Sequence, residues 1–106
     1  MTFADYMNKS MLYEESSNNR RVKVSKNKYG KLLISVDLHG MQKEEAKYFI
    51  RRLIDRNPFA FSLEIIHGFH HGTILRNMVN QELVSRRILK RYSNSWNPGS
   101  TYLTII

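Results

Sequence analysis

The chain has 106 residues, of which 42% are hydrophobic, so we expect one small domain with a single sheet and one layer of helices. Because it has no cysteine, it has no disulfide framework, thiolate metal site or cysteine nucleophile. Its 17 Lys and Arg against 9 Asp and Glu give a net charge of +8, which favours a polyanionic partner: nucleic acid first, an anionic membrane surface second.

Residues 1–30 read as an N-terminal extension and basic linker, and residues 31–106 as the folded domain. Residues 1–19 end in a Ser/Asn cluster that is typical of a linker. Residues 20–31 contain six basic residues and no acid. Val22 and Val24 alternate with charged residues, which is one argument for a short extra strand. A basic arm for phosphates and a solvated connector are the alternatives.

The folded domain predicts the element order βαβαββ. Alternating apolar residues indicate a strand over 32–38, and a nearly continuous apolar run indicates a second over 62–66. Shorter strands follow over 86–92 and 101–106. One helix begins around residues 42–44 and ends before Asn57-Pro58, and another begins near residues 72–73 and continues to Leu83. The residues expected to face the core are Ala46, Phe49, Ile50, Leu53 and Ile54, then Ile74, Leu75, Met78, Val79 and Leu83.

These elements predict a two-layer α/β (α+β) sandwich. Right-handed crossovers place both helices on one face of a four-stranded mixed sheet. The first two strands each run into a His-Gly pair, His39-Gly40 and His67-Gly68. Carboxyl ends of parallel strands meet at one edge, so we expect both loops, which carry all four histidines, to form a common rim.

Two motifs in these loops resemble those of Smr (small MutS-related) domains. The first is Val36-Asp37-Leu38-His39-Gly40-Met41, and the second is Ile65-Ile66-His67-Gly68 followed by Gly72-Thr73 and Leu75-Arg76. Asn97-Pro98-Gly99 before a Thr-rich last strand also fits the stand-alone bacterial members. The resemblance covers residues 32–106. It departs at Phe69 and His70, where a basic residue and a glycine are common, and at Gln42, where a helix-capping Thr or Ser is usual.

The resemblance implies a fold similar to the C-terminal domain of bacterial translation initiation factor three, binding of DNA or RNA and, in several members, metal-stimulated endonuclease activity. The catalytic candidates are Asp37, His39 and His67, because a carboxylate and two imidazoles supply a base, an acid and a group that orients them. Asp37 could equally only bond its own turn, and a histidine at a strand end could be structural. The candidates for binding phosphate or bases are Gly40, Gly68, Phe69, His70, His71, Gly72, Thr73, Arg76, Arg86, Arg87, Lys90 and Arg91.

Cofactors and partners follow from the same residues. A divalent cation, Mg²⁺ or Mn²⁺, is expected beside Asp37, with no organic cofactor. A zinc site at His67, His70 and His71 is disfavoured, since two glycines make this a turn and no cysteine or carboxylate completes the set. Tyr92 and Trp96 near basic residues suit single-stranded nucleic acid, or else a capped sheet edge.

Three functions remain open at this point. The first is a nucleic-acid-binding endonuclease that cleaves RNA or branched or nicked DNA. The second is a non-catalytic module that binds RNA or the ribosome through the same rim, and the third is a protein-interaction domain whose charge only aids solubility. We expect a cytoplasmic protein with no small-molecule substrate and no membrane span, because neither a signal peptide nor a run of about 18 apolar residues occurs.

Overall fold

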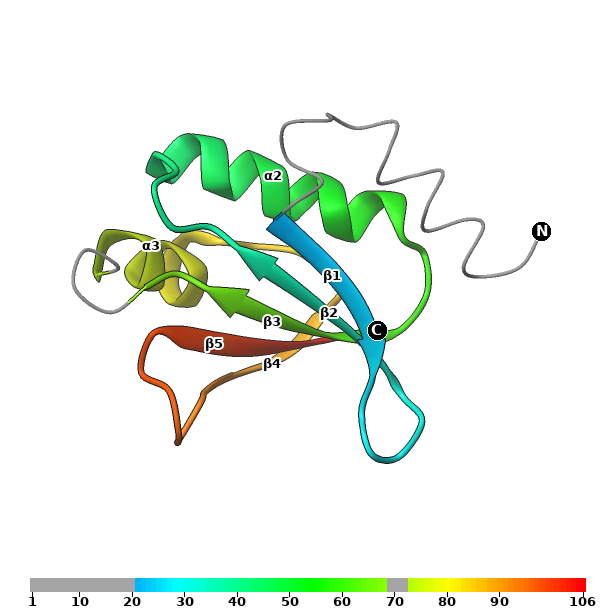
Figure 1. Cartoon of the computed structure of the whole chain (residues 1–106). Coiled ribbons are helices and arrows are strands. Elements are labelled where there is room, and N and C mark those ends of the chain that lie inside the picture. Colours follow the sequence, from blue (N-terminus) through cyan, green and yellow to red (C-terminus); the bar gives the residue numbers. More distant parts are fainter. Residues whose placement is uncertain (1–20, 69–72) are drawn as a thin grey trace.

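The computed structural model describes residues 21–68 and 73–106, which form one mixed sheet and a layer of helices (Figure 1). The sheet has the order β1-β2-β3-β5-β4, in which β2 and β3 are parallel and every other pair is antiparallel. The α/β class and the mixed sheet are therefore as predicted. The elements are β1 (Val22–Lys26), β2 (Leu32–Asp37), α2 (Lys43–Arg56), β3 (Phe61–Ile66), α3 (Thr73–Asn77), the π-helical turn η2 (Met78–Glu82), β4 (Ile88–Ser93) and β5 (Ser100–Ile105).

The sheet has five strands, so the predicted number of four is wrong. The additional strand is β1, whose Val22 pairs with Val36 of β2. The turn between them is stabilised by Asn27, whose Oδ1 accepts hydrogen bonds from the backbone N–H groups of Tyr29 and Lys31, both at 2.9 Å. This part of the basic segment is thus an edge strand, which confirms the argument from the alternating valines. Residues 1–20 lie outside the described part of the chain.

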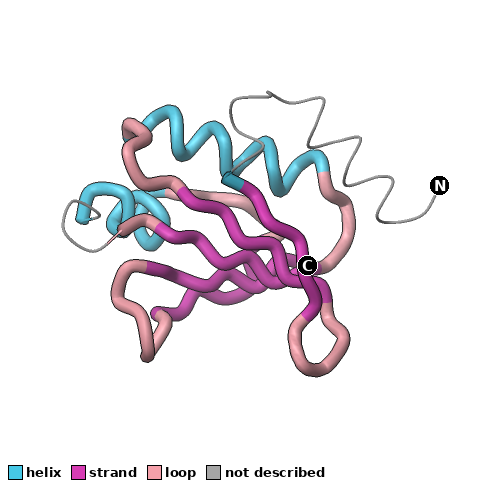
Figure 2. Tube along the Cα trace, viewed as in Figure 1, coloured by secondary structure: helices cyan, strands magenta, loops and turns pink. Residues whose placement is uncertain are grey.

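Both helical segments cover the same face of the sheet, as the crossover rule predicts (Figures 1 and 2). Alternate residues of the central strands are buried beneath them, whereas the intervening residues are only half-buried. Two predicted core positions differ: Phe49 is only partly buried, and Ile74 is exposed. Leu75 and Val79 lie on the inward side of the second helical segment, and Ile74 falls at the margin of this stripe in the first turn. None of the helices in the described residues is long and apolar enough to cross a membrane.

Candidate nucleic-acid interface

The two His-Gly loops meet at one end of the sheet. Asp37 at the end of β2 pairs with Ile66 at the end of β3, and the Leu38 N–H donates to the Ile66 carbonyl at 2.8 Å. A methyl group added to Gly68 would lie 3.9 Å from the His39 Cβ. Gly40 and Gly68 adopt φ values of 82° and 90°, a left-handed conformation that glycine adopts without strain. The common edge expected from the parallel strands is therefore present.

Asp37 and His39 form an exposed pair in the first loop. Asp37 Oδ1 accepts hydrogen bonds from the His39 backbone N–H at 3.0 Å and from His39 Nδ1 at 2.7 Å. Because Nδ1 donates, Nε2 carries the lone pair of the neutral ring, and it makes no hydrogen bond to a described residue. The side chains are 73% exposed for His39 and 38% for Asp37. This pair can therefore meet an external ligand.

The carboxyl group of Asp37 is held in its ionised form. Partial burial raises the pKa of Asp37, but the two hydrogen bonds from His39 and the charges of His39 and Arg21 outweigh it and lower the pKa overall. An ionised carboxylate orients the imidazole and stabilises the imidazolium that forms when Nε2 takes a proton. The pair thus has the geometry of a general base and the residue that orients it.

Arg21, immediately before β1, supports this loop. Its Nη1 donates to the backbone carbonyls of Asp37 and His39, both at 3.0 Å. Arg21 is not among the predicted site residues, because it is one of six basic residues in a segment that the sequence predicts as a linker. No local pattern distinguishes it; only the antiparallel pairing of β1 with β2 brings it to the rim.

His67 lies beneath the surface, which argues against the catalytic role predicted for it. It is 2% exposed, and its Nδ1 donates to the Gly68 carbonyl at 3.1 Å while its Nε2 accepts from Thr101 Oγ1 at 3.0 Å. Burial lowers the pKa of His67; the Gly68 bond opposes this shift, and the charge of Arg76 adds to it. His67 is therefore a neutral group with both ring nitrogens engaged, and it positions the second loop instead of touching a substrate.

A third segment, Asn94 to Gly99, completes the rim. The carbonyl of Gly99 accepts from the backbone N–H groups of His67 at 2.9 Å and Gly68 at 3.0 Å. The turn is itself held by Asn94 Oδ1, which accepts from the Trp96 N–H, and by Asn97 Oδ1, which accepts from the Gly99 N–H. Here "the rim" means residues 37–40, 67–68 and 94–99. The sequence showed this segment only as a turn, without its contact to the second loop.

The remaining candidates near the second loop are only partly placed. Thr73 begins α3 and is exposed. Arg76 is exposed on α3, its charge acts on His67, and its side chain makes no hydrogen bond to a described residue. Arg76 therefore supplies a cation that is available to a phosphate. Phe69, His70, His71 and Gly72 lie outside the described residues.

Four predicted binding residues, Arg86, Arg87, Lys90 and Arg91, do not lie at the rim, and their contact with nucleic acid stays a prediction. Strand β4 runs towards the rim, so its beginning and the residues before it, Arg86 and Arg87, lie at the far end of the sheet, where Ile88 pairs with Ile105. Arg87 donates to the carbonyls of Ile106 at 2.7 Å, Phe59 at 2.5 Å and Ile54. Its guanidinium thus links α2, the loop after α2 and the residue after β5 by hydrogen bonds.

The other two of these four residues lie along β4. Arg91 donates from Nη1 to the Val79 carbonyl at 2.5 Å, so it ties the strand to the helix layer. Lys90 is exposed and pairs with Thr104, well back from the rim. Arg87 and Arg91 thus bond backbone carbonyls. The sequence cannot distinguish such arginines from those whose charge is free to meet a ligand.

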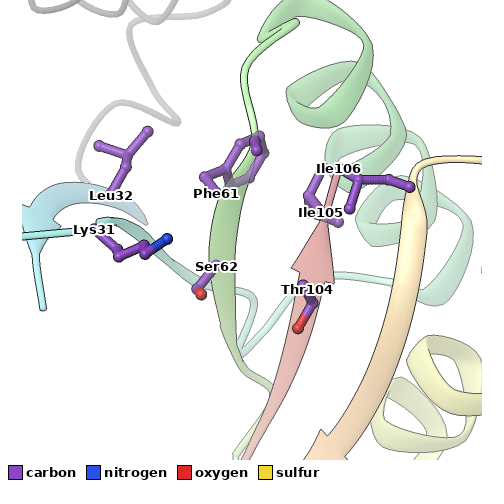
Figure 3. Close-up of a pocket in the computed structure, with 8 residues that line it drawn as sticks. Lys31, Leu32, Phe61, Ser62, Thr104, Ile105 and Ile106 are labelled. Carbon is purple, nitrogen blue, oxygen red and sulfur yellow. The ribbon is translucent and has the colours of Figure 1, made fainter. Parts of the chain in front are cut away.

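The hollow in Figure 3 lies at the far end of the sheet as well. It has a volume of about 200 Å³, and its lining consists of Lys31, Leu32, Ala60, Phe61, Ser62, Thr104, Ile105 and Ile106. None of these is a predicted site residue. The exposure of His39 opens the rim to solvent, which suits a polymer better than a buried small molecule.

The described residues do not form a metal cage. Within residues 21–68 and 73–106, no three His, Asp or Glu side chains lie together in a group that could hold a metal ion. Asp37 is the one carboxylate in the rim, and one of its oxygens already accepts two bonds from His39. This donor set does not fit a resident divalent cation.

Comparisons with known proteins agree with the motifs and the topology. The family model of the Smr domain matches residues 36–104. Among solved structures, the crystal structure of the Smr domain of Thermus thermophilus MutS2 matches with a TM-score of 0.53 and 17% identity, over 68% of this chain and 96% of that one. At this identity the likeness shows the fold alone. No curated protein matches the chain.

Proposed function

Because the chain belongs to the Smr domain family, we propose that it binds nucleic acid at the rim and cleaves it as an endonuclease. The observation that carries this proposal is the exposed Asp37–His39 pair, with 2.7 Å between Oδ1 and Nδ1, at an edge of a basic domain where the two motif loops meet. The pair offers a base to solvent, and Arg76, which is exposed on α3 after the second loop, offers a cation. Those are the groups that phosphodiester hydrolysis needs.

The reaction follows from these positions. His39 Nε2 takes a proton from a water molecule as its oxygen attacks phosphorus, and Asp37 stabilises the imidazolium that forms. The bond from phosphorus to the leaving oxygen breaks, and that oxygen takes a proton from solvent. Arg76 faces the charge that grows on the phosphoryl oxygens. His67 and Arg21 do not touch the substrate; they hold the two loops in place.

A divalent cation enters this proposal only as a condition of the assay. Mg²⁺ usually binds through one or two carboxylates together with substrate phosphates. Since the rim has one carboxylate that is already bonded to His39, we derive no step through a metal. Assays with Mg²⁺, Mn²⁺ or EDTA measure whether the protein–substrate complex recruits one.

The test compares variants at the rim with a matched one at the far end. Purified protein is incubated with labelled single-stranded RNA, duplex DNA and a branched duplex. Asp37→Asn and His39→Ala should lower the cleavage rate by about 10² to 10⁴. Arg76→Ala should also lower it, whereas Arg86→Ala, the loss of an exposed arginine at the other end of the sheet, should leave it unchanged.

Other outcomes select the other functions. Binding without cleavage by the wild-type protein, unaffected by Asp37→Asn and His39→Ala, would contradict the endonuclease and support a module that binds RNA or the ribosome. Neutralising several phosphates makes affinity fall steeply as salt rises. An affinity without that dependence would contradict both nucleic-acid functions and leave a protein-interaction domain.

A further inference from the structure

The face of the sheet opposite α2 and α3 presents one row of side chains across all five strands. Cross-strand pairs share a face, and the registers join the row in order: Lys23 with Ser35, Ser35 with Glu64, Glu64 with Tyr102, and Tyr102 with Tyr92. The cartoon and the tube show α2 and α3 on the other side of the sheet (Figures 1 and 2). We call this set the open-face row. It is polar at one end and aromatic at the other.

The aromatic end is pre-organised. The rings of Tyr92 and Tyr102 are stacked, with centroids 5.4 Å apart and planes inclined by 19°. Glu64 accepts a hydrogen bond from Ser35 Oγ at 2.9 Å, and burial together with the nearby charge of Glu64 raises the pKa of the Tyr102 hydroxyl. Tyr102 is half-buried and stacked against Tyr92, which is 48% exposed. A flat ring held in place loses little entropy when another ring stacks on it.

This row lies next to the proposed catalytic pair. Asp37 pairs with Ile66 and Ile66 with Ser100, so Tyr102 is two residues along β5 from the strand position level with Asp37. Two residues of a strand span roughly 7 Å, and three strand spacings separate β2 from β4 by roughly 15 Å. That separation corresponds to a few nucleotides of an extended strand. A nucleic-acid strand bound at His39 is therefore long enough to reach the tyrosine pair within a few nucleotides.

A further exposed aromatic residue, Trp96, belongs to the rim itself. Trp96 is 96% exposed, although the turn that carries it is held by side chain to backbone hydrogen bonds. This turn extends beyond the strands, away from α2 (Figure 1). Trp96 follows Tyr92 by four residues. Two exposed aromatic positions on one side of a domain with a net charge of +8 match the combination that binds unpaired bases and their phosphates.

We propose that the open-face row and Trp96 form a stacking surface for single-stranded nucleic acid that leads into the rim. This inference rests on the proposed function for the role of the rim, and it adds the substrate class. Bases of a duplex are stacked on each other and cannot lie on Tyr92, whereas unpaired bases can. Lys23 at one end of the row and Lys90 beside Tyr92 provide charges for the backbone.

The experiment uses the one tryptophan of the chain as its probe. A 12-nucleotide single strand, as RNA and as DNA, is titrated into the protein in EDTA while Trp96 fluorescence and oligonucleotide anisotropy are recorded. The same sequence as a duplex is titrated in parallel. We expect quenching of Trp96 by the single strands and weaker binding of the duplex.

Variants separate stacking from folding. Tyr92→Ala should weaken binding of the single strand about tenfold, and Tyr92→Phe, which keeps the ring, should restore it. The matched control is Tyr48→Ala: Tyr48 is also exposed and lies beside Arg52, but on α2. Tyr48→Ala should leave the affinity unchanged. Circular dichroism checks that each variant is folded.

Stacking of bases on Tyr92 and Trp96 and cleavage of nucleic acid can be tested separately. Equal affinity of wild type and Tyr92→Ala, or an unquenched Trp96 at saturation, would overturn the stacking surface even if the protein cleaves nucleic acid. Conversely, quenching and dependence on Tyr92 in a protein that cleaves nothing would support the stacking surface and contradict the endonuclease.

Discussion

The loops after β2 and β3 contain the same two residues, histidine and glycine, yet they do different things. His39 is exposed and bonded to Asp37, whereas His67 is buried and bonded to Thr101. The difference comes from their neighbours. β3 lies in the middle of the sheet. The loop after β3 is held by the turn before β5, because the Gly99 carbonyl accepts hydrogen bonds from the N–H groups of His67 and Gly68. A shared dipeptide therefore places two loops together, but the packing around each one decides which histidine meets the solvent.

The largest expected difference between the two histidines is in the free energy of unfolding when each is replaced. His67→Ala should lower the free energy of unfolding by about 2 to 4 kcal/mol, because it leaves a cavity and an unpaired Thr101 hydroxyl in the interior. His39→Ala should change it by no more than about 0.5 kcal/mol, since the side chain is exposed. Urea denaturation of both variants measures the difference. Equal losses in the two variants would contradict the contrast.

The pH dependence of stability provides a second test. Because the pKa of folded His67 lies below its unfolded value of 6.5, the unfolded chain binds the proton first. The contribution of His67 to stability is therefore complete above about pH 6.5 and is lost as the pH falls below that value. The contribution of Asp37, whose pKa is lowered from 3.8, is also present at neutral pH and is lost only in more acidic solution.

This loss should depend on the imidazole of His67. Between pH 7.5 and 5, the melting temperature of the wild type should fall, and that of His67→Gln should fall less. Thermal unfolding followed by circular dichroism at each pH measures this. A steeper dependence in His67→Gln than in the wild type would show that the sign is wrong.

Arg21 offers a smaller perturbation, confined to the first loop. Arg21→Ala removes the donor to the carbonyls of Asp37 and His39, so we expect about tenfold slower cleavage with a loss of stability below about 1 kcal/mol. Lys23→Ala on the same edge strand is the matched control and should leave the rate constant of cleavage in the bound complex unchanged. Single-turnover assays at saturating protein measure that rate constant. An unaffected rate in Arg21→Ala would remove Arg21 from the site.

The smallest effect concerns the helix that follows the first loop. Gln42 occupies the N-cap position of α2 and makes no capping hydrogen bond with its side chain. Gln42→Ser should raise the free energy of unfolding by about 0.5 to 1 kcal/mol, because serine can accept a bond from the first turn. Cleavage should not change. Denaturation together with the cleavage assay checks both, and slower cleavage would mean that Gln42 contacts the substrate.

Much of the fold was predictable because the spacing of apolar residues along each element shows which of its faces is buried. The alternation from Leu32 to Leu38 and the three-and-four spacing from Ala46 to Ile54 located β2 and α2 to within a residue or two. The strand–loop–helix order, with right-handed crossovers, then predicted that β2 and β3 are parallel and that their loops meet. The pair Asp37 and His39 could be chosen on the same grounds, because both residues belong to one short loop.

What the sequence by itself determined is therefore local: where each strand and helix lies, and which loop carries a carboxylate next to a histidine. The tertiary structure decided which histidine is covered, which arginines bond carbonyls, and that Arg21 reaches the first loop. The physical reason is that the exposure of a side chain and the acceptor it bonds depend on segments far away in the chain. Arg87 and Arg76 look alike in sequence, but Arg87 bonds the carbonyls of Ile106 and Phe59, whereas Arg76 is exposed and its charge acts on His67.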